Sequence, residues 1–173
     1  MSLFQRILKV DRDVFFLINS KWTNPLFDLI LPYSRNAITW IPFYLFLLIF
    51  MLLNHKRKAF LWILLAVATA AATDLISSRL VKGHIFRLRP CHDVLLHVRF
   101  LAQYCPQSSS FTSSHAANHF GLSTFIYLTL NRFYGKWVSV IFLWAFLVSY
   151  AQVYVGVHYP LDVIGGAAVG VII

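Results

Sequence analysis

Four long runs without a charged side chain constrain the fold of this sequence more than any other feature. Each run approaches the roughly 20 residues that a helix needs to cross the hydrocarbon of a bilayer. The runs cover residues 37–53, 59–73, 116–131 and 137–157. Hydrophobic side chains make up 59% of the chain and charged ones only 12%, so the bilayer is the expected solvent. Because a membrane segment must satisfy its own backbone hydrogen bonds, we predict an all-α, polytopic bundle of transmembrane helices.

A fifth apolar run begins at Val163 and continues to Ile173, where the sequence stops about half a span short. No internal repeat or low-complexity tract divides the chain. We therefore expect one membrane domain over residues 1–173, truncated within its last transmembrane helix.

The N-terminal segment, residues 3–19, is expected to form an amphipathic helix. Apolar side chains recur in it at helical spacing. Charged residues interrupt the apolar stretch that a cleaved signal peptide would need, so the segment is expected to be retained. We place this helix in the interface between bilayer and water. A helix that faces the aqueous phase is the alternative.

The formal net charge of +9 suits an anionic membrane surface or an anionic substrate. Nucleic acid is a weaker interpretation, because no basic run is interleaved with exposed aromatic residues outside the apolar segments. Two short basic turns, residues 55–58 and 132–136, fall on the same side of the membrane, and the positive-inside rule makes that side cytoplasmic. The long polar segment, residues 83–114, is also basic, so charge alone does not orient the chain.

The two cysteines of the chain, Cys91 and Cys105, lie in this long polar segment. A disulfide between them would close a loop of about 15 residues, stabilise it by about 3 kcal/mol and require an oxidising compartment. Two free thiols are the alternative, whereas the spacing does not match that of metal ligands. We therefore place the segment on the outer side of the membrane.

The first of three polar clusters follows the second apolar run and contains Lys82 and Arg89. The two cations lie seven residues apart and would share one helical face if the helix continued, although Pro90 favours ending it there. Asp74 and Ser78 precede Lys82 on that face, so Asp74 is expected to hold the lysine. The alternative is that these cations only extend toward lipid headgroups.

The second cluster, residues 108–118, is rich in serine and leads into the third apolar run. Small hydroxyl residues before a helix supply caps and leave backbone N–H groups free, which is the geometry that binds anions. His115 would then lie beside a bound phosphate. A plain helix cap followed by a solvated histidine is the alternative.

The third cluster joins the fourth and fifth apolar runs. Pro160 suits the first turn of a helix, which places His158 just outside the helix and Asp162 within its first turn. The carboxylate can then bind one ring nitrogen of His158 and leave the other as a nucleophile or base. A helix-capping aspartate is the alternative, and the two roles are compatible. If the long segment is outside, all three clusters lie on one side of the membrane, and this coincidence is hard to explain by packing.

These clusters resemble the motifs of the type 2 phosphatidic acid phosphatase superfamily, which read K-x6-R-P, P-S-G-H and S-R-x5-H-x3-D. Residues 82–90 match the first motif completely. Residues 112–115 match the second with threonine for proline and serine for glycine. The third matches only in part, because Ala151 and Gln152 occupy its serine and arginine positions.

The resemblance implies a membrane lipid phosphatase of bacterial type that needs no metal or other cofactor. It makes His158 the nucleophile, Asp162 the residue that orients it, and His115 the acid and then the base. It also implies residues that hold the phosphoryl oxygens, namely Lys82, Arg89, Ser113, Ser114 and Gln152. The substrate would be undecaprenyl pyrophosphate, phosphatidylglycerol phosphate, phosphatidate or a lipid A phosphate, reached from the outer face of the inner membrane.

The neutral Gln152 is the main departure from the family pattern. Loss of one charged contact in a catalytic site costs on the order of 100-fold in rate. Arg87, two residues before the matched arginine, is a candidate for the missing charge. Gln152 also favours the alternative function, a non-catalytic binder or transporter of phosphorylated lipid. A vanadium-dependent haloperoxidase would share the motifs, but the short membrane-embedded chain argues against it.

Overall fold

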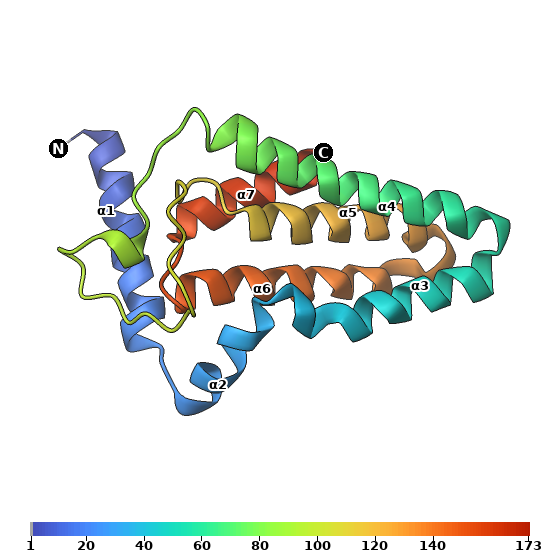
Figure 1. Cartoon of the computed structure of the whole chain (residues 1–173), viewed down its shortest axis with the longest axis horizontal. Helices are drawn as coiled ribbons and strands as arrows, with labels where there is room; N and C mark the ends of the chain where they lie inside the picture. The colour runs from blue at the N-terminus through green and yellow to red at the C-terminus, as the bar shows by residue number, and fades with distance from the viewer. Residues whose placement is uncertain (1) are drawn as a thin grey trace.

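The computed structural model describes residues 2–173, and the secondary structure of this part of the chain is all helix, with no strand (Figure 1). The prediction of an all-α membrane bundle is confirmed. The α-helices are α1 (Leu3–Phe16), α2 (Pro25–Ser34), α3 (Ile41–His55), α4 (Arg57–Leu75), α5 (Ser114–Tyr134), α6 (Ile141–Tyr154) and α7 (Pro160–Ile172). Short π-helical turns (Leu17–Lys21, Ile76–Val81) and 3₁₀ turns (Ala37–Trp40, Pro90–His92, Gly135–Val140) extend or connect them.

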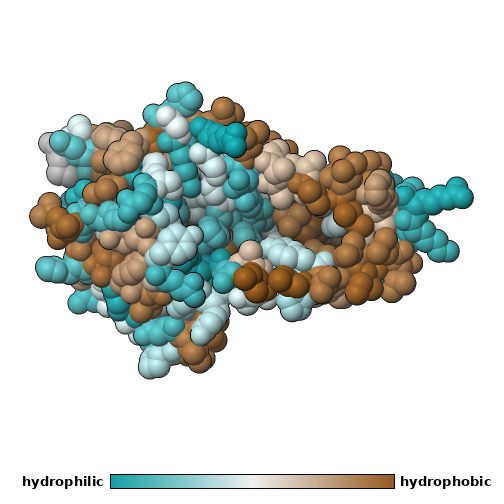
Figure 2. All heavy atoms as spheres, viewed as in Figure 1, coloured by the Kyte–Doolittle hydropathy of each residue, from teal (hydrophilic) through white to brown (hydrophobic). Residues whose placement is uncertain are grey.

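Three helical stretches are long and apolar enough to cross a bilayer: Ala37–His55, Arg57–Val81 and Ser114–Tyr154. The last contains α5 and α6, which are joined by a 3₁₀ turn and run side by side (Figure 1). The predicted apolar runs therefore become α3 to α6. α7 is a shorter apolar helix. Figure 2 shows hydrophobic side chains covering the part of the surface formed by α3 and α4, as expected for helices that face lipid.

Helix α5 is the centre of the bundle and packs against α4, α6 and α7. Two glycines of α7 allow its close approach to α5. A Cβ atom on Gly166 would lie 2.3 Å from the carbonyl oxygen of Ser113, and one on Gly170 would lie 2.3 Å from that of Ala117. Because only glycine leaves this space empty, the start of α7 lies directly against the start of α5.

Helices α1 and α2 and the long polar loop, residues 84–113, cover one end of the bundle (Figure 1). The amphipathic N-terminal helix was predicted, whereas α2 was not. Its start nevertheless carries a recognisable signal, because the Asn24 side chain accepts a hydrogen bond from the Phe27 N–H and Pro25 occupies the first turn. The loop is closed by a disulfide between Cys91 and Cys105, whose Cα atoms lie 6.1 Å apart.

Candidate active site

The polar clusters meet at the end of the bundle that α1, α2 and the long loop cover. The first cluster contacts the second through Lys82, whose Nζ donates a hydrogen bond to Ser114 Oγ at 2.9 Å. It contacts the third through Arg89, whose guanidinium lies 3.0 Å from Nε2 of His158. Residues from three distant parts of the sequence thus surround one small volume.

Lys82 follows the π-helical turn Ile76–Val81 that ends the second span. The expected ion pair with Asp74 is absent from the described residues, and that prediction is wrong. Asp74 instead accepts a hydrogen bond from Ser78 at 3.2 Å, and Ser78 contacts Ser114 at 3.0 Å. A π-turn adds a residue to the helical repeat, so side chains eight positions apart no longer lie over each other.

Arg89 reaches the site by a different path from the one the spacing suggested. The helix does not continue from Lys82 to Arg89, since the chain after residue 84 is irregular and Arg89 is extended (φ −73°, ψ 150°). A residue before proline favours this conformation. The guanidinium is buried and also donates to the Val157 carbonyl at 3.1 Å. The two cations therefore converge because the loop folds back, not because they share a helical face.

The start of α5 is built as the second cluster predicts. Ser113 is the N-cap, and its Oγ accepts a hydrogen bond from the Ala116 N–H at 3.4 Å. Its own N–H donates to the Asp162 carbonyl at 2.9 Å, which ties α5 to α7. The first N–H groups of a helix have no carbonyl partner within it, so those of Ser114 and His115 are available to an anion.

His158 lies just before α7 and is 3% exposed. Its Nδ1 is 3.5 Å from the Asp162 carboxylate, which also accepts a hydrogen bond from the Tyr159 N–H at 2.8 Å. Its Nε2 points to the opposite side, toward Arg89. This arrangement favours the tautomer with the proton on Nδ1, and it leaves the Nε2 lone pair facing the guanidinium of Arg89.

Burial sets the protonation of both His158 and Lys82. It lowers the pKa of His158 to about 4, an effect that the hydrogen bond to Asp162 opposes and the charge of Arg89 reinforces. It also lowers the pKa of Lys82 to about 8, again with help from Arg89. At neutral pH the imidazole is therefore neutral and can act as a nucleophile, while the lysine is largely charged.

Arg87 does not take the place of the missing motif arginine. It donates to Oδ1 of Asp162 at 2.7 Å and forms a second ion pair with Asp11 of α1. Its guanidinium also stacks over the Tyr159 ring, 4.1 Å from the centroid. The charge of Arg87 is thus engaged by two carboxylates on the far side of Asp162 from His158.

Gln152 lies on α6 and is fully buried. Its Oε1 accepts a hydrogen bond from Nε of Arg35 at 3.3 Å, and its Nε2 has no hydrogen-bond partner among residues 2–173. Arg35 follows the last residue of α2. Nothing in the sequence spacing indicates this contact, because the two residues are 117 positions apart.

His115 occupies the first turn of α5. It also lines a cavity of about 530 Å³, whose other walls are largely apolar residues of α3, α4, α5 and α6. Figure 2 shows the surface hollowed between α3 and α4. The cavity therefore extends from the polar cluster into the part of the protein that faces lipid.

These features together suit a phosphoryl group. Cations and helix N–H groups can hold its oxygens, and a neutral imidazole backed by a carboxylate faces the same volume. Within residues 2–173, no group of three or more histidine, cysteine or acidic side chains is arranged to hold a metal ion.

Known proteins resemble this chain in sequence and in fold. Lipid A 4'-phosphatase of Bacteroides thetaiotaomicron is 31% identical over 85% of this chain and 66% of its own length. The enzyme of the same name from Porphyromonas gingivalis is 31% identical over 96% of this chain and 71% of its own length. Undecaprenyl-diphosphatase of Sulfolobus acidocaldarius is 34% identical over 85% and 65%. The chain thus spans about two thirds of these curated relatives.

Two crystal structures have the same fold. LpxE of Aquifex aeolicus superposes with a TM-score of 0.68 at 30% identity, over 94% of this chain and 91% of its own. A transmembrane PAP2-type phosphatidylglycerolphosphate phosphatase of Bacillus subtilis superposes with a TM-score of 0.64 at 22% identity, over 99% and 82%. The family model described as PAP2 superfamily matches residues 59–173, which include all three polar clusters. The chain therefore belongs to the PAP2 superfamily of integral membrane proteins.

Proposed function

We propose that this protein is a lipid phosphatase that hydrolyses a phosphomonoester or pyrophosphate of a membrane lipid through a phosphohistidine. One observation carries the proposal: Nε2 of the buried His158 lies 3.0 Å from the guanidinium of Arg89, in a polar cluster whose Lys82 contacts Ser114 in the wall of the apolar cavity. A phosphate bound in this cluster would lie beside the nucleophile, and the lipid chain attached to that phosphate would extend into the cavity.

Phosphate binding comes first. Lys82, Arg89 and the N–H groups at the start of α5 hold the non-bridging phosphoryl oxygens, with Ser113 and Ser114 shaping the turn. Such contacts supply most of the catalysis in phosphoryl transfer, because little covalent chemistry is left to the protein.

The chemistry then proceeds in two displacements. Nε2 of His158 attacks phosphorus, the bond from phosphorus to the leaving oxygen breaks, and His115 gives its proton to that oxygen. Water next attacks the phosphohistidine, His115 takes the proton from the water, and the phosphorus–nitrogen bond breaks. Inorganic phosphate and neutral His158 result. Asp162 holds the Nδ1 proton throughout and stabilises the positive charge on the ring.

The cavity supports a lipid as the substrate. Its walls are aliphatic and aromatic side chains such as Leu47, Leu48 and Trp62, and its polar end contains Ser114 and His115. A phosphorylated lipid would place its headgroup among the cations and a hydrocarbon chain between α3 and α4. The names of the relatives make lipid A phosphates and undecaprenyl diphosphate the first lipids to test, before phosphatidylglycerol phosphate and phosphatidate.

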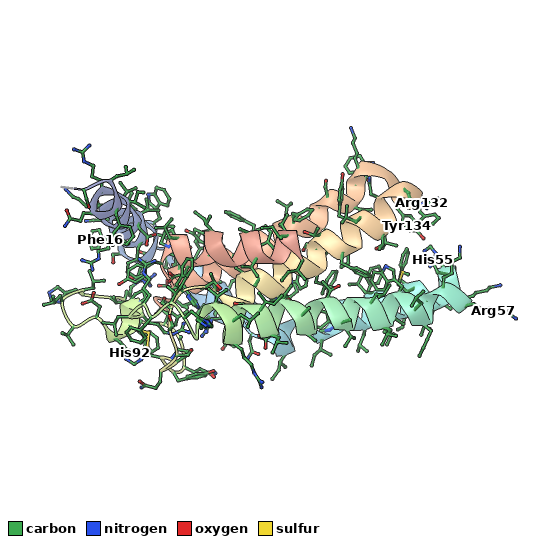
Figure 3. All side chains as sticks on the ribbon, turned by 90° about the horizontal axis from the view of Figure 1, so that it is seen from above. Phe16, His55, Arg57, His92, Arg132 and Tyr134 are labelled. Carbon is green, nitrogen blue, oxygen red and sulfur yellow. A yellow bond between two sulfur atoms is a disulfide. The ribbon has the colours of Figure 1, made fainter. Side chains whose placement is uncertain are left out.

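Two features support an active site on the outer face of a bacterial inner membrane. The loop beside the site contains the Cys91–Cys105 disulfide, and disulfides persist in oxidising compartments. The opposite end of the bundle carries the basic turns at residues 55–58 and 132–136, as expected for the cytoplasmic side (Figure 3).

The test is phosphate release by the purified chain in mixed micelles, with a chelator present and the four lipid classes as substrates. His158→Ala and His115→Ala are compared with the unmodified protein. We expect release from at least one lipid and a loss of at least about 1,000-fold in both variants.

Each other outcome has a distinct meaning. Full activity in His158→Ala contradicts the phosphohistidine. Retained lipid binding without any release, in the unmodified protein, favours the non-catalytic binder. Phosphate release that stops when the chelator is added contradicts a metal-independent reaction.

A further inference from the structure

Arg35 is a cation near the site that the motifs do not assign and that no acidic side chain among residues 2–173 pairs with. Of the arginines close to His158, Arg87 is neutralised by Asp11 and Asp162. Arg35 has no carboxylate partner among the described residues, and its one side-chain hydrogen bond there goes to the neutral Gln152. A half-buried guanidinium without a counter-ion is unfavourable, which indicates that an anion belongs beside it.

The surroundings of Arg35 fix its position. It directly follows α2, where Leu31 and Ser34 are buried and the Trp40 side chain donates to the Ser34 carbonyl at 2.6 Å. The Trp40 ring in turn packs against Trp144 of α6, with centroids 5.7 Å apart. The backbone at Arg35 is therefore held by the packing of α2 and Trp40 against α6, and it is not part of a free loop.

The charges around Arg35 are those of the phosphate cradle. Arg35 contacts Gln152, whose carbonyl accepts a hydrogen bond from the His158 N–H at 3.3 Å, and Arg89 contacts the ring of His158. Burial lowers the pKa of Arg89, and repulsion from Arg35 adds to that effect. Two like charges in a buried site are stable together when an anion lies between them.

Gln152 completes the arrangement. Because its Oε1 accepts from Arg35, the orientation of its amide is set, and Nε2 must be the free end. That donor is fully buried and has no partner among residues 2–173. A phosphoryl oxygen would satisfy it, since unpaired buried donors are costly.

We infer that Arg35 is a phosphate-binding residue that supplies, from α2, the positive charge that the third family motif places at position 152. The inference rests on the proposed function and deepens it. Gln152 positions Arg35 and donates one hydrogen bond to the same phosphoryl group. The positive charge that the motif places on α6 is thus supplied by the residue that follows α2, a helix that the motifs do not include.

The test relocates the charge. Arg35→Gln removes it, and the double variant Arg35→Gln with Gln152→Arg returns it to the motif position. Arg57→Gln is the matched control, because Arg57 is exposed at the opposite end of the bundle (Figure 3). Each variant is titrated with inorganic orthovanadate, a phosphate analogue, by calorimetry, and is assayed for phosphate release from the lipid panel.

We expect Arg35→Gln to lower kcat/KM about 100-fold and to weaken orthovanadate binding at least about tenfold. The double variant should regain at least about tenfold of each loss, and Arg57→Gln should match the unmodified protein. A purely structural role predicts no recovery in the double variant. If Arg35→Gln folds poorly, Arg35→Lys replaces it in the test. Because lysine keeps the charge, its orthovanadate affinity and kcat/KM should lie between those of the unmodified protein and those expected for Arg35→Gln.

Unchanged orthovanadate affinity in Arg35→Gln overturns the inference, and so does a double variant that binds no better than the single one. Failure of the proposed function has a different signature: the unmodified protein releases no phosphate from any lipid. Orthovanadate binding does not need turnover, so the titration still tests Arg35 in that case.

Discussion

Asp162 links more of the site than any other residue. One carboxylate oxygen faces His158 and accepts hydrogen bonds from Ser110 and the Tyr159 N–H, while the other binds Arg87. The side chain is fully buried, so its negative charge depends on these partners. In the proposed mechanism it orients the nucleophile, and it also connects α7 to α1, because Arg87 extends from Asp162 to Asp11.

Replacing Asp162 with asparagine should separate these roles. The amide cannot stabilise a positive imidazole, and half of its orientations present N–H to the ring, so we expect kcat to fall by about 10²–10⁴-fold. Phosphate release and orthovanadate affinity measure the effect. A large loss of kcat with orthovanadate binding within a few-fold of normal is expected. Equal losses of both would show that the carboxylate mainly supports the cradle.

The lowered pKa of Lys82 predicts an alkaline limit to activity. The charged form binds phosphate, and it is lost as the pH rises through about 8. His158 must be neutral to attack, and its pKa near 4 keeps it so at neutral pH. The pH profile of kcat/KM should therefore fall above about pH 8 and again in acid. In Lys82→Arg the alkaline fall should vanish, because arginine stays protonated; an unchanged profile assigns the limit to another group.

The sequence was sufficient to identify the residues that the motifs contain, because their identity and order are local. It could not identify Arg35, whose partner is 117 residues away, nor the true use of Arg87. It also misplaced Asp74, because a π-helical turn shifts the register and leaves no mark in residue spacing.

At the scale of elements, the contact between α5 and α7 sets the position of the nucleophile. Gly166 and Gly170 allow the backbones to touch, and the Asp162 carbonyl accepts the Ser113 N–H there. The turn before α5, our proposed phosphate-binding turn, and the turn that carries His158 are thus fixed to each other by main-chain contacts rather than by long side chains.

Gly166→Ala should disturb both turns. The new methyl group would lie 2.3 Å from the Ser113 carbonyl oxygen, and a backbone cannot yield cheaply. We expect a destabilisation of about 1–3 kcal/mol and a marked fall in kcat. Thermal inactivation of the detergent-solubilised protein and phosphate release measure these two effects. Val171→Ala, at a half-exposed position on the same helix, is the control; an equal effect there would remove the glycine contact as the cause.

The sequence predicted those helices whose length and composition are set by the thickness of the bilayer. The long apolar runs became α3 to α6, since a span must be helical and of a given length. Helix α2 lacks such a constraint, and its internal Pro32 weakens the helical pattern. Yet Arg35 directly follows α2, so by our inference the element that was hardest to predict bears on the chemistry.

At the scale of the whole molecule, the two ends of the bundle differ in chemistry. One end bears the disulfide, α1, α2 and the site, and the other bears only short basic turns (Figures 1 and 3). This asymmetry predicts a fixed orientation in the membrane.

Single cysteines at the two ends test that orientation. Val94 in the long loop is 92% exposed, and Lys58 is exposed at the other end. The native cysteines are bonded to each other, so Val94→Cys and Lys58→Cys each add one free thiol. A membrane-impermeant maleimide should label position 94 in intact spheroplasts and position 58 only after permeabilisation. The reverse pattern would place the site in the cytoplasm.

The cavity between α3 and α4 has a consequence for how such a catalyst meets its substrate. In the proposed reaction the lipid enters sideways from the bilayer, so its relevant concentration is a mole fraction within a two-dimensional sheet, not a molarity in water. The two products then leave in different phases, phosphate to the aqueous side and the dephosphorylated lipid back between the helices. Diluting the substrate with inert lipid should slow the reaction even when the total amount of substrate in the tube is constant.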